Sequence, residues 1–523
     1  MASVFLDLRR YALVLLAIFG SLELGSASKP HPEVRTSLPS GAQKACQILQ
    51  QEFPGLVAFP GSTQFVDDNE HWAVTSESNS TCSVEPQTVD DISTILQLVG
   101  RSDIRSPFAV KSGGHAYNLG FSSTPGVQIA MSKFNNLSVN AEKKTATIGV
   151  GLTWDKVYQM LEPFGVMVTG GRIPGIGVGG LSLGGGYSWK TNQFGLTVDT
   201  IASFDLVLPT GKQVHVTNQT NPDLFFALKG GQNNFGIVTS IEFETHPQSQ
   251  IWLKRRRQGG SITYAGNVTD SLNLATANFS INNTDPKAQM IVTYASVAGQ
   301  SLAQVFPFYD GPTPPAGIFD AFLSIPNIAT NVSTQSFVEF MDGTFGTGDL
   351  GIGPFGIAQH VIPIVQYTIP VLEQIVNQVT TVGEQLTAQN NGSIVVVSVG
   401  AEPFLKPNSH DRGGAYPHSA SRQITPASPF IGFQTDPTLP AAVQAAKRAP
   451  LVPVIKQFTH AIQAAAVSQG QSQWDDVLYP NYALSDTPLN LLFGENVPRL
   501  QALARKYDPQ RVMSLTGGFS LLD

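Results

Sequence analysis

Lys111-Ser112-Gly113-Gly114-His115 is the stretch of sequence from which we infer the fold. It follows the apolar run Phe108–Val110 and precedes another at Val127–Met131, so we expect a turn between two strands. The glycines free the backbone, and successive N–H groups can then converge on one anion. His115 brings a nucleophilic ring nitrogen to the same place. This combination suits a phosphate-bearing cofactor that histidine holds covalently; a glycine turn with a bystander histidine is the alternative.

A second glycine-rich block, GGRIPGIGVGGLSLGGGY, occupies residues 170–187. It superficially resembles a dinucleotide fingerprint, with Asp199 at the distance of a ribose-binding acid. A Rossmann unit needs a helix directly after the glycines, whereas Gly184–Gly186 would interrupt one. We therefore expect an extended backbone that wraps a ligand, and a purely structural glycine loop is the alternative. Because neither block carries a cluster of Arg or Lys, backbone N–H groups would bind the anion.

The composition indicates a large, acidic and turn-rich protein. The chain has 523 residues, a formal net charge of −7, 49 glycines and 35 prolines. This length predicts about two to four domains. The negative charge argues against a general nucleic-acid binder, so we expect a small-molecule substrate and no nucleic acid as partner.

Residues 1–28 have the pattern of a secretory signal peptide. Arg9-Arg10 precede the apolar run Tyr11–Gly20, and small residues follow at Gly25–Ser28. A buried first helix is the alternative. The apolar run is too short for a membrane span, and no later stretch is long and apolar enough. We therefore expect a secreted protein without a membrane span.

The cysteines and sequons agree with secretion. Cys46 and Cys82 are the only cysteines, and one disulfide between them is expected in an oxidising compartment; two separate thiols are the alternative. No Cys-x-x-Cys or His-Glu-x-x-His pattern occurs, so no metal centre is expected. The eight Asn-x-Ser/Thr sequons, all predicted glycosylation sites, are Asn79, Asn136, Asn218, Asn267, Asn278, Asn282, Asn331 and Asn391.

The best-defined elements are predicted between residues 82 and 248. Thr88 and Asp91 form a helix-start signal, and Pro209-Thr210-Gly211 predicts a hairpin turn. Asn221-Pro222 predicts the start of a short helix. Residues 249–465 have few clear motifs, and we expect them to form a separate domain.

Several blocks of the chain, taken together, resemble one known family. From about residue 40 to the C-terminus the chain is similar to secreted FAD-linked oxidoreductases of the berberine-bridge-enzyme-like group, within the vanillyl-alcohol-oxidase/p-cresol-methylhydroxylase superfamily, and fungal members are the most similar in style. The resemblance is strongest at Lys111–His115, Gly177–Tyr187, Gly236–Val238, Tyr479–Tyr482 and Tyr507–Pro509. Matched blocks in the right order are more specific than any one glycine motif.

The resemblance implies an α+β fold with two parts. One is a two-subdomain FAD-binding domain of the p-cresol-methylhydroxylase type. The other is a substrate domain with an antiparallel sheet backed by helices. The implied limits are 29–77 for an N-terminal segment of the flavin domain, 78–248 for the FAD-binding domain, 249–469 for the substrate domain and 470–523 for a C-terminal segment that returns to the flavin domain.

The resemblance also implies how FAD is held. Ser112, Gly113 and Gly114 would bind the pyrophosphate, and His115 would bond to the 8α-methyl group of the isoalloxazine. Bicovalent members carry a second attachment, a cysteine, where this chain has Ile173, so we expect attachment through His115 alone. Further residues implied to line the cofactor are Gly177, Gly179, Gly180, Gly184, Gly185 and Gly186 on the other side, Gly236 and Ile237 near the adenine, and Asn481 at the ring system.

Three tyrosines match positions that line the active site in the family. We expect Tyr479 to act as the base and Tyr117 and Tyr187 to orient the substrate, with core packing as the alternative for each. A tyrosine has a pKa near 10 and needs an activating partner, which the sequence does not identify. Gln434 is a candidate polar group on the substrate side.

These observations predict an FAD-dependent oxidoreductase. We expect an oxidase that removes hydride from an alcohol, a carbohydrate or a secondary metabolite and passes the electrons to O2. One alternative is a flavin-containing protein that binds or cyclises a metabolite without net redox turnover. Another is an NAD-type dehydrogenase, which would need a Rossmann helix after Gly180.

Overall fold

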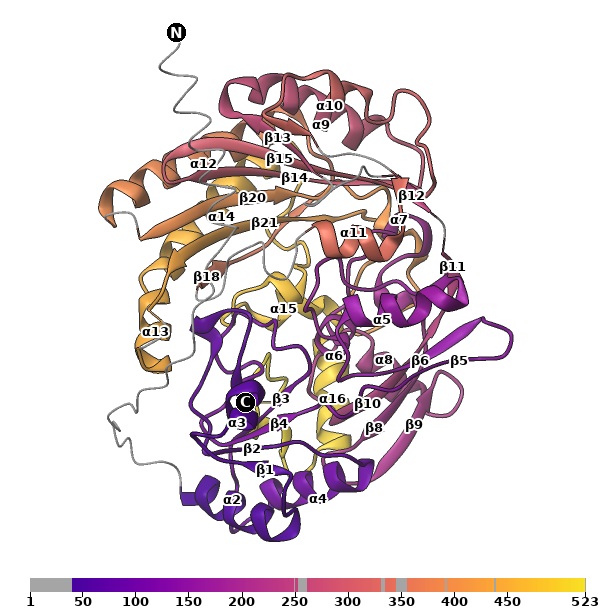
Figure 1. Cartoon of the computed structure of the whole chain (residues 1–523), viewed down its shortest axis with the longest axis vertical. Coiled ribbons are helices and arrows are strands. Elements are labelled where there is room, and N and C mark those ends of the chain that lie inside the picture. Colours follow the sequence, from indigo (N-terminus) through magenta and orange to yellow (C-terminus); the bar gives the residue numbers. More distant parts are fainter. Residues whose placement is uncertain are drawn as a thin grey trace.

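The chain forms two parts, which lie one above the other in Figure 1. The structure, a computed structural model, describes residues 40–248, 250–252, 261–330, 334–344, 355–390, 393–436 and 439–522. The predicted signal peptide and the sequons at Asn331 and Asn391 lie outside these residues. Among the described helices, none is long and apolar enough to cross a membrane.

The first sheet of the lower part carries the His115 turn. Its described strands are ordered β1-β2-β4-β3, with β2 and β3 both parallel to β4. The predicted helix start is confirmed, because Thr88 and Asp91 form a capping box at the beginning of α4. The strands are β1 (Val57–Ala58), β2 (Cys82–Val84), β3 (Phe108–Lys111) and β4 (Val127–Ala130), and the helices are α2 (Ser40–Glu52), α3 (Thr63–Asn69) and α4 (Val89–Gly100).

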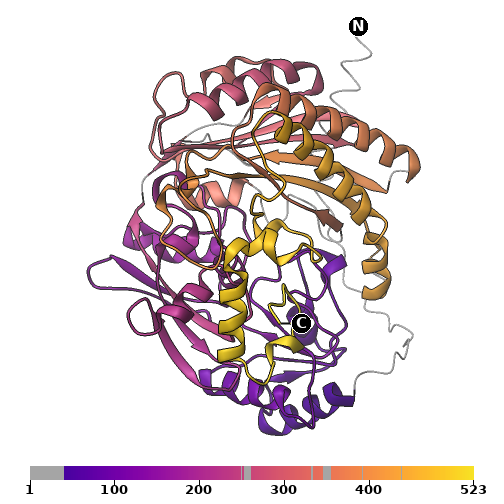
Figure 2. The same cartoon turned by 180° about the vertical axis from the view of Figure 1, so that it is seen from behind.

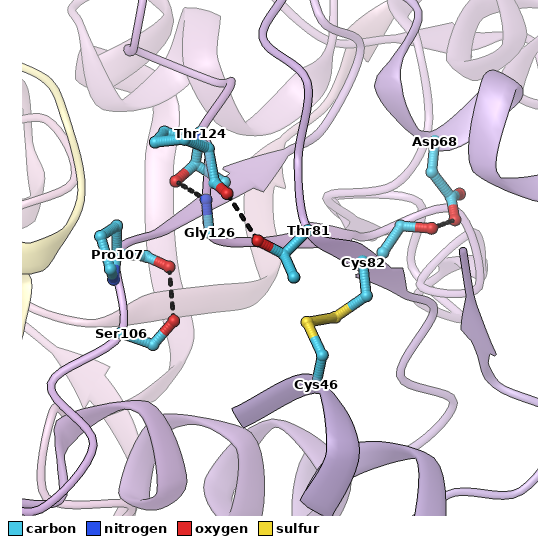
Figure 3. Close-up of a disulfide and its surroundings, with 10 residues drawn as sticks. Cys46, Asp68, Thr81, Cys82, Ser106, Pro107, Thr124 and Gly126 are labelled. Carbon is cyan, nitrogen blue, oxygen red and sulfur yellow. Dashed lines mark hydrogen bonds between the residues drawn. A yellow bond between two sulfur atoms is a disulfide. The ribbon is translucent and has the colours of Figure 1, made fainter. Parts of the chain in front are cut away.

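The predicted disulfide is present and joins this sheet to the first described helix. Cys46 of α2 is bonded to Cys82 of β2 across a sequence separation of 36 residues (Figure 3). Closing a loop of this size restricts the unfolded chain and stabilises the fold by about 4 kcal/mol on the chain-entropy model. The helix is therefore fixed to an inner strand of the sheet that contains the His115 turn.

The second sheet of the lower part is antiparallel, with its described strands in the order β5-β6-β10-β8-β9. The predicted hairpin is confirmed as β8 and β9, and the predicted short helix as α8. The elements are β5 (Leu137–Val139), β6 (Thr145–Gly149), α5 (Trp154–Leu161), α6 (Val178–Leu183), α7 (Thr191–Phe194), β8 (Ile201–Val207), β9 (Gln213–Thr217), α8 (Pro222–Leu228) and β10 (Ile237–Glu244).

The upper part is one antiparallel sheet backed by helices, as expected. In its described residues the main strand order is β16-β13-β15-β14-β20-β21-β18. Helices α9, α12 and α14 cover its outer face (Figures 1 and 2). The elements are β13 (Ile262–Ala265), α9 (Thr269–Asn282), β14 (Ala288–Val297), β15 (Gln300–Tyr309), β16 (Ala329–Thr330), β18 (Phe355–Gln359), α12 (Ile369–Gln389), β20 (Ile394–Ala401), β21 (Thr425–Gln434) and α14 (Leu451–Ser468).

The alternation of side chains along β14 shows how the upper sheet joins two cores. Met290 and Val292 point to the core beneath α9, α12 and α14, whereas Ile291 belongs to the core of the lower part. This is the period of two expected of a strand with both faces covered. The inner face of the sheet therefore packs on the lower part.

The C-terminal segment packs in the core of the lower part. Leu500 and Leu503 of α16 (Val497–Tyr507) are buried there together with residues of both lower sheets. Figure 2 shows this yellow segment against the purple N-terminal elements. Other described elements are β7 (Val166–Met167), β11 (His246–Pro247), β12 (Ile251–Trp252), α10 (Asp320–Ser324), β17 (Thr334–Gln335), α11 (Phe337–Thr344), β19 (Ile362–Ile364), α13 (Ala441–Arg448) and α15 (Leu489–Phe493).

All six sequons within the described residues are exposed. They are Asn79, Asn136, Asn218, Asn267, Asn278 and Asn282. An exposed sequon satisfies the geometric requirement for a glycan acceptor.

Candidate active site

The two glycine-rich blocks meet at Ser112. Its hydroxyl donates to the carbonyl of Val150 and accepts the backbone N–H of Gly179, at 3.2 Å, in the first turn of α6. A Cβ at Gly113 would lie 2.4 Å from the backbone nitrogen of Gly177. The two loops therefore touch through their backbones, and a side chain at either glycine would force them apart.

His115 is half-buried and electrically neutral at pH 7. Its imidazole stacks on Trp72 with the ring centroids 4.2 Å apart and an angle of 13° between the planes. Burial lowers the pKa of His115 to about 4. Its Nε2 is buried and has no hydrogen-bond partner in the described part of the chain. A buried polar atom without a partner is costly, and a bond to a cofactor would explain this one.

The second glycine block contains a short helix, where we expected extended backbone, but the helix is interrupted at Gly184 as expected. Helix α6 begins after Gly177 and ends at Gly184. It is only six residues long, because Gly185 and Gly186 then take φ angles of 110° and 82°. A short helix followed by a sharp turn is not the long crossover helix of a Rossmann unit.

Asn481 closes this turn from the C-terminal segment. Its Nδ2 donates to the carbonyl of Leu181 at 3.2 Å and to the hydroxyl of Tyr479 at 2.9 Å. A Cβ at Gly184 would lie 2.0 Å from the Asn481 Oδ1. Gln232 donates to that same oxygen at 3.4 Å, a contact that the sequence did not suggest.

The other predicted cofactor residues have different surroundings. Ile237 is buried at the start of β10, and a Cβ at Gly236 would lie 2.2 Å from the carbonyl oxygen of Val207. Gly180 is exposed, and a Cβ there would contact nothing within 4 Å. Packing therefore requires glycine at 236 but not at 180. Gln434, at the end of β21, is exposed.

The three predicted tyrosines are buried and lie around Asn481. The Tyr187 ring is 4.9 Å from that of Tyr479, and the Tyr117 hydroxyl donates to the carbonyl of Asn481 at 3.2 Å. Burial raises the pKa of all three hydroxyls, which are therefore protonated at neutral pH. None of the three has a carboxylate as a hydrogen-bond partner within the described residues.

Arg172, Glu402 and Tyr482 form a buried triad that the sequence interpretation missed. The Arg172 guanidinium donates to Glu402 Oε2 at 2.6 Å and to the Tyr482 hydroxyl at 2.8 Å. The Tyr482 hydroxyl donates to Glu402 Oε1 at 3.2 Å. Arg172 lies inside the second glycine block and Tyr482 ends the Tyr479–Tyr482 motif, so both were within reach of motif analysis. Glu402 follows β20 in the upper sheet and carried no local signal.

Burial dominates the pKa shifts of the two acidic members of the triad, Glu402 and Tyr482. It raises the pKa of Glu402 above 4.5, although the charge of Arg172 acts in the opposite direction. It also raises the pKa of Tyr482, again against the pull of Arg172. The Tyr482 ring lies 4.9 Å from the Tyr479 ring. The triad is thus joined to the glycine loops through Tyr479 and Asn481.

Asp199, which resembled a ribose-binding acid in the sequence, has a different partner. Its carboxylate lies 2.9 Å from His418 Nε2, and both side chains are buried. His418 Nδ1 contacts the carbonyl oxygen of Tyr416 at 2.8 Å. This pair links the lower part to the loop between β20 and β21 of the upper sheet.

Comparison with known proteins identifies an FAD-binding domain and its relatives. The FAD binding domain family matches residues 80–217. The FAD-dependent monooxygenase drtC of Aspergillus calidoustus is 30% identical over 495 residues, which cover 91% of this chain and 90% of that protein. The bifunctional solanapyrone synthase of Alternaria solani is 31% identical over 291 residues, which cover 54% of this chain and 55% of that protein.

Two solved structures share the fold over nearly the whole described chain. A variant of berberine bridge enzyme in complex with (S)-reticuline matches with a TM-score of 0.72 at 14% identity, over 93% of this chain and 99% of its own. The carbohydrate oxidase from Microdochium nivale matches with a TM-score of 0.71 at 17% identity, over 91% of this chain and 99% of its own.

The chain thus has the fold of berberine bridge enzyme, and its FAD binding domain defines it as a flavoenzyme. The chain belongs to the berberine-bridge-enzyme-like family of FAD-linked oxidoreductases, as its resemblance implied. It is an FAD-dependent oxidoreductase.

Proposed function

We propose that the protein is a secreted oxidase that holds FAD covalently through His115. It removes hydride from the carbon that bears a hydroxyl group in a small secondary metabolite. FAD, when bound, supplies the hydride acceptor. Ser112, Gly113 and Gly114 would hold its pyrophosphate together with the glycines of the second block. Two observations fit bound FAD: the two loops meet at Ser112, and the buried Nε2 of His115 has no hydrogen-bond partner among the described residues.

The observation that carries the proposed chemistry is the Arg172–Glu402–Tyr482 triad. Oxidation of a hydroxyl group requires a proton acceptor as well as a hydride acceptor. The Tyr482 hydroxyl is protonated at rest and donates a hydrogen bond to Glu402. A substrate hydroxyl that donates to Tyr482 would lose its proton to Tyr482 as Tyr482 passes its own proton to Glu402. Two N–H groups of Arg172 hold Glu402 Oε2 and the Tyr482 hydroxyl oxygen in place.

This assigns the base to Tyr482 in place of Tyr479. Tyr479 contacts the Asn481 amide, which offers it no proton acceptor. We propose that Tyr479, Tyr187 and Tyr117 shape the space beside the flavin. Tyr479 lies beside the turn at Gly185, Tyr187 packs on Tyr479, and Tyr117 donates to the carbonyl of Asn481.

The preference for a secondary metabolite is supported by the names of the more similar relatives. Proteins about 30% identical include the monooxygenase drtC and a solanapyrone synthase, whereas the carbohydrate oxidases are below 20% identical. Secretion is supported by the signal-peptide pattern, the disulfide and the six exposed sequons. A mass loss on treatment with an N-glycosidase would test the glycans.

Acid precipitation tests the covalent link. Yellow colour should remain with the protein pellet and should be lost to the supernatant in His115→Ala. His215→Ala, which changes an exposed histidine, is the matched control and should keep the colour. A colourless pellet from FAD-loaded wild-type protein would exclude covalent attachment.

Substrate-dependent bleaching of the flavin without oxygen tests the redox step. Reoxidation in air with one H2O2 released per substrate oxidised supports an oxidase. Because several relatives are named monooxygenases, the reaction should also be run in ¹⁸O2. Label in the product would exclude the oxidase, and turnover without bleaching would favour metabolite cyclisation without net redox change.

A further inference from the structure

Trp72 forms one wall of the space around His115. The two rings are stacked nearly parallel, with centroids 4.2 Å apart. The backbone N–H of Trp72 also donates to the carbonyl of Gly114 at 3.0 Å. Trp72 thus contacts the attachment turn twice, once through its ring and once through its backbone.

The segment that carries Trp72 is fixed on both sides. His71 Nδ1 lies 2.7 Å from the carbonyl oxygen of Asn69, and its Nε2 lies 3.1 Å from that of Ser122. The backbone N–H of His71 donates to Glu77 Oε1 at 3.2 Å. The indole itself packs with Tyr117 and with Ile357 of the upper sheet. These contacts limit how far the indole can move away from the imidazole.

We propose that Trp72 is the positioning residue for covalent attachment of FAD to His115. The stacked indole covers one face of the imidazole and opposes rotation of its ring, so that the unpartnered Nε2 keeps one direction. Restricting a nucleophile to a reactive geometry lowers the entropic part of the barrier. This inference rests on the covalent link proposed above and assigns a role to a residue outside the glycine loops.

The bond formation balances as an oxidation by O2. The N–H of the neutral imidazole and one C–H of the flavin 8α-methyl group break, and one N–C bond forms. Two protons and two electrons leave and reduce O2 to H2O2, so FAD ends in its oxidised form. Because burial keeps His115 neutral, its ring nitrogen is available as the nucleophile.

The test compares variants that keep bulk at position 72 but differ in stacking. Trp72→Leu removes the aromatic face, and Trp72→Phe retains one. Trp474→Leu is the matched control, because Trp474 also stacks on a histidine, His460, with centroids 4.8 Å apart. For each full-length protein, total bound FAD is measured before acid precipitation and pellet-bound FAD after it, and folding is followed by circular dichroism.

Trp72→Leu should still bind FAD, but its covalent fraction should fall about tenfold, since attachment then depends on an imidazole that is free to turn. Trp72→Phe and Trp474→Leu should retain most of the wild-type fraction. Equal covalent fractions in Trp72→Leu and Trp474→Leu would overturn the proposal. If the leucine variant does not fold, Trp72→Met replaces it, and if neither folds, Trp72 is a packing residue and the proposal is overturned.

The outcomes separate this inference from the proposed function. Covalent FAD in both wild type and Trp72→Leu, with none in His115→Ala, would refute the role of Trp72 and leave the covalent link standing. Wild-type FAD that acid releases completely would refute the covalent link itself and the role of Trp72 with it.

Discussion

At the scale of single residues, the hydroxyl of Tyr482 lies between a cation and an anion. Tyr482→Phe removes the hydroxyl that bonds to Arg172 and to Glu402. Glu402→Gln removes the carboxylate that accepts the proton. Loss of a general base typically lowers kcat by about 10²- to 10⁴-fold. We expect this loss in both variants, with bound FAD unchanged, in stopped-flow measurements of flavin reduction. Tyr264→Phe, which changes a buried tyrosine that donates to the carbonyl of Phe322, is the control. A fully active Tyr482→Phe variant would contradict the assignment.

The pH dependence of flavin reduction follows from Glu402. Burial raises the pKa of this carboxyl above 4.5, and only its ionised form accepts the Tyr482 proton. Activity should therefore fall as the pH drops through that raised pKa and should be complete above it. In Glu402→Gln the remaining activity should lose this acidic limb. An acidic limb of the same midpoint in both proteins would show that another group controls it.

Residues were predictable from the sequence where local chemistry was sufficient. Ser112 and His115 stood out because glycines next to a nucleophile are a local pattern, although their proposed roles in holding FAD remain predictions. The pairing of Arg172 with Glu402 was not predictable, because it joins residues 230 positions apart, one in a loop of the lower part and one just after β20 of the upper sheet. A buried ion pair has no signature in either segment by itself.

At the scale of elements, close backbone contact makes Gly177 sensitive to substitution. A Cβ at Gly177 would lie 2.2 Å from the backbone nitrogen of Gly113, whereas one at Gly180 would contact nothing within 4 Å. Gly177→Ala should therefore separate the two loops and reduce the FAD content of the purified protein. Gly180→Ala should leave it unchanged, as judged by the ratio of flavin to protein absorbance. Equal FAD content in both variants would show that the loop contact is not needed for binding.

Elements with strong end signals were predicted correctly, and the glycine-rich helix was not. The capping box at Thr88 and the proline at 222 start helices where expected, since each satisfies local requirements of a helix start. Glycines disfavour a helix by about 1 kcal/mol each, which led to the wrong prediction for α6. Tertiary contacts override that preference: Val178 and Ser182 are buried, and Ser112 accepts the N–H of Gly179 in the first turn.

At the scale of the whole molecule, the His418–Asp199 pair links the two parts in a pH-dependent way. Burial alone would lower the pKa of His418, but the hydrogen bond and charge of Asp199 outweigh burial, and the pKa is raised above 6.5. The stabilisation is therefore complete below pH about 6.5 and is lost as the pH rises through the higher folded-state pKa. Asp199→Asn should lower the Tm at pH 6, and the difference from wild type should narrow in alkaline buffer.

An exposed pair serves as the control for this experiment. His215 and Asp205 lie 2.8 Å apart, but both side chains are about half exposed, where ion pairs contribute little. Asp205→Asn should therefore change the Tm much less than Asp199→Asn at the same pH. A Tm difference for Asp199→Asn that is constant from pH 6 to pH 9 would contradict the titration of His418.

The return of the C-terminal segment to the lower core has a consequence for biosynthesis. The ribosome makes both glycine loops first, and Asn481, which closes the turn at Gly184, follows Leu181 by 300 residues. A nascent chain that ends before residue 481 therefore lacks one wall of the cofactor site, with the whole upper sheet already made. We therefore expect stable flavin binding only after Asn481 has been translated and has packed against the turn at Gly184.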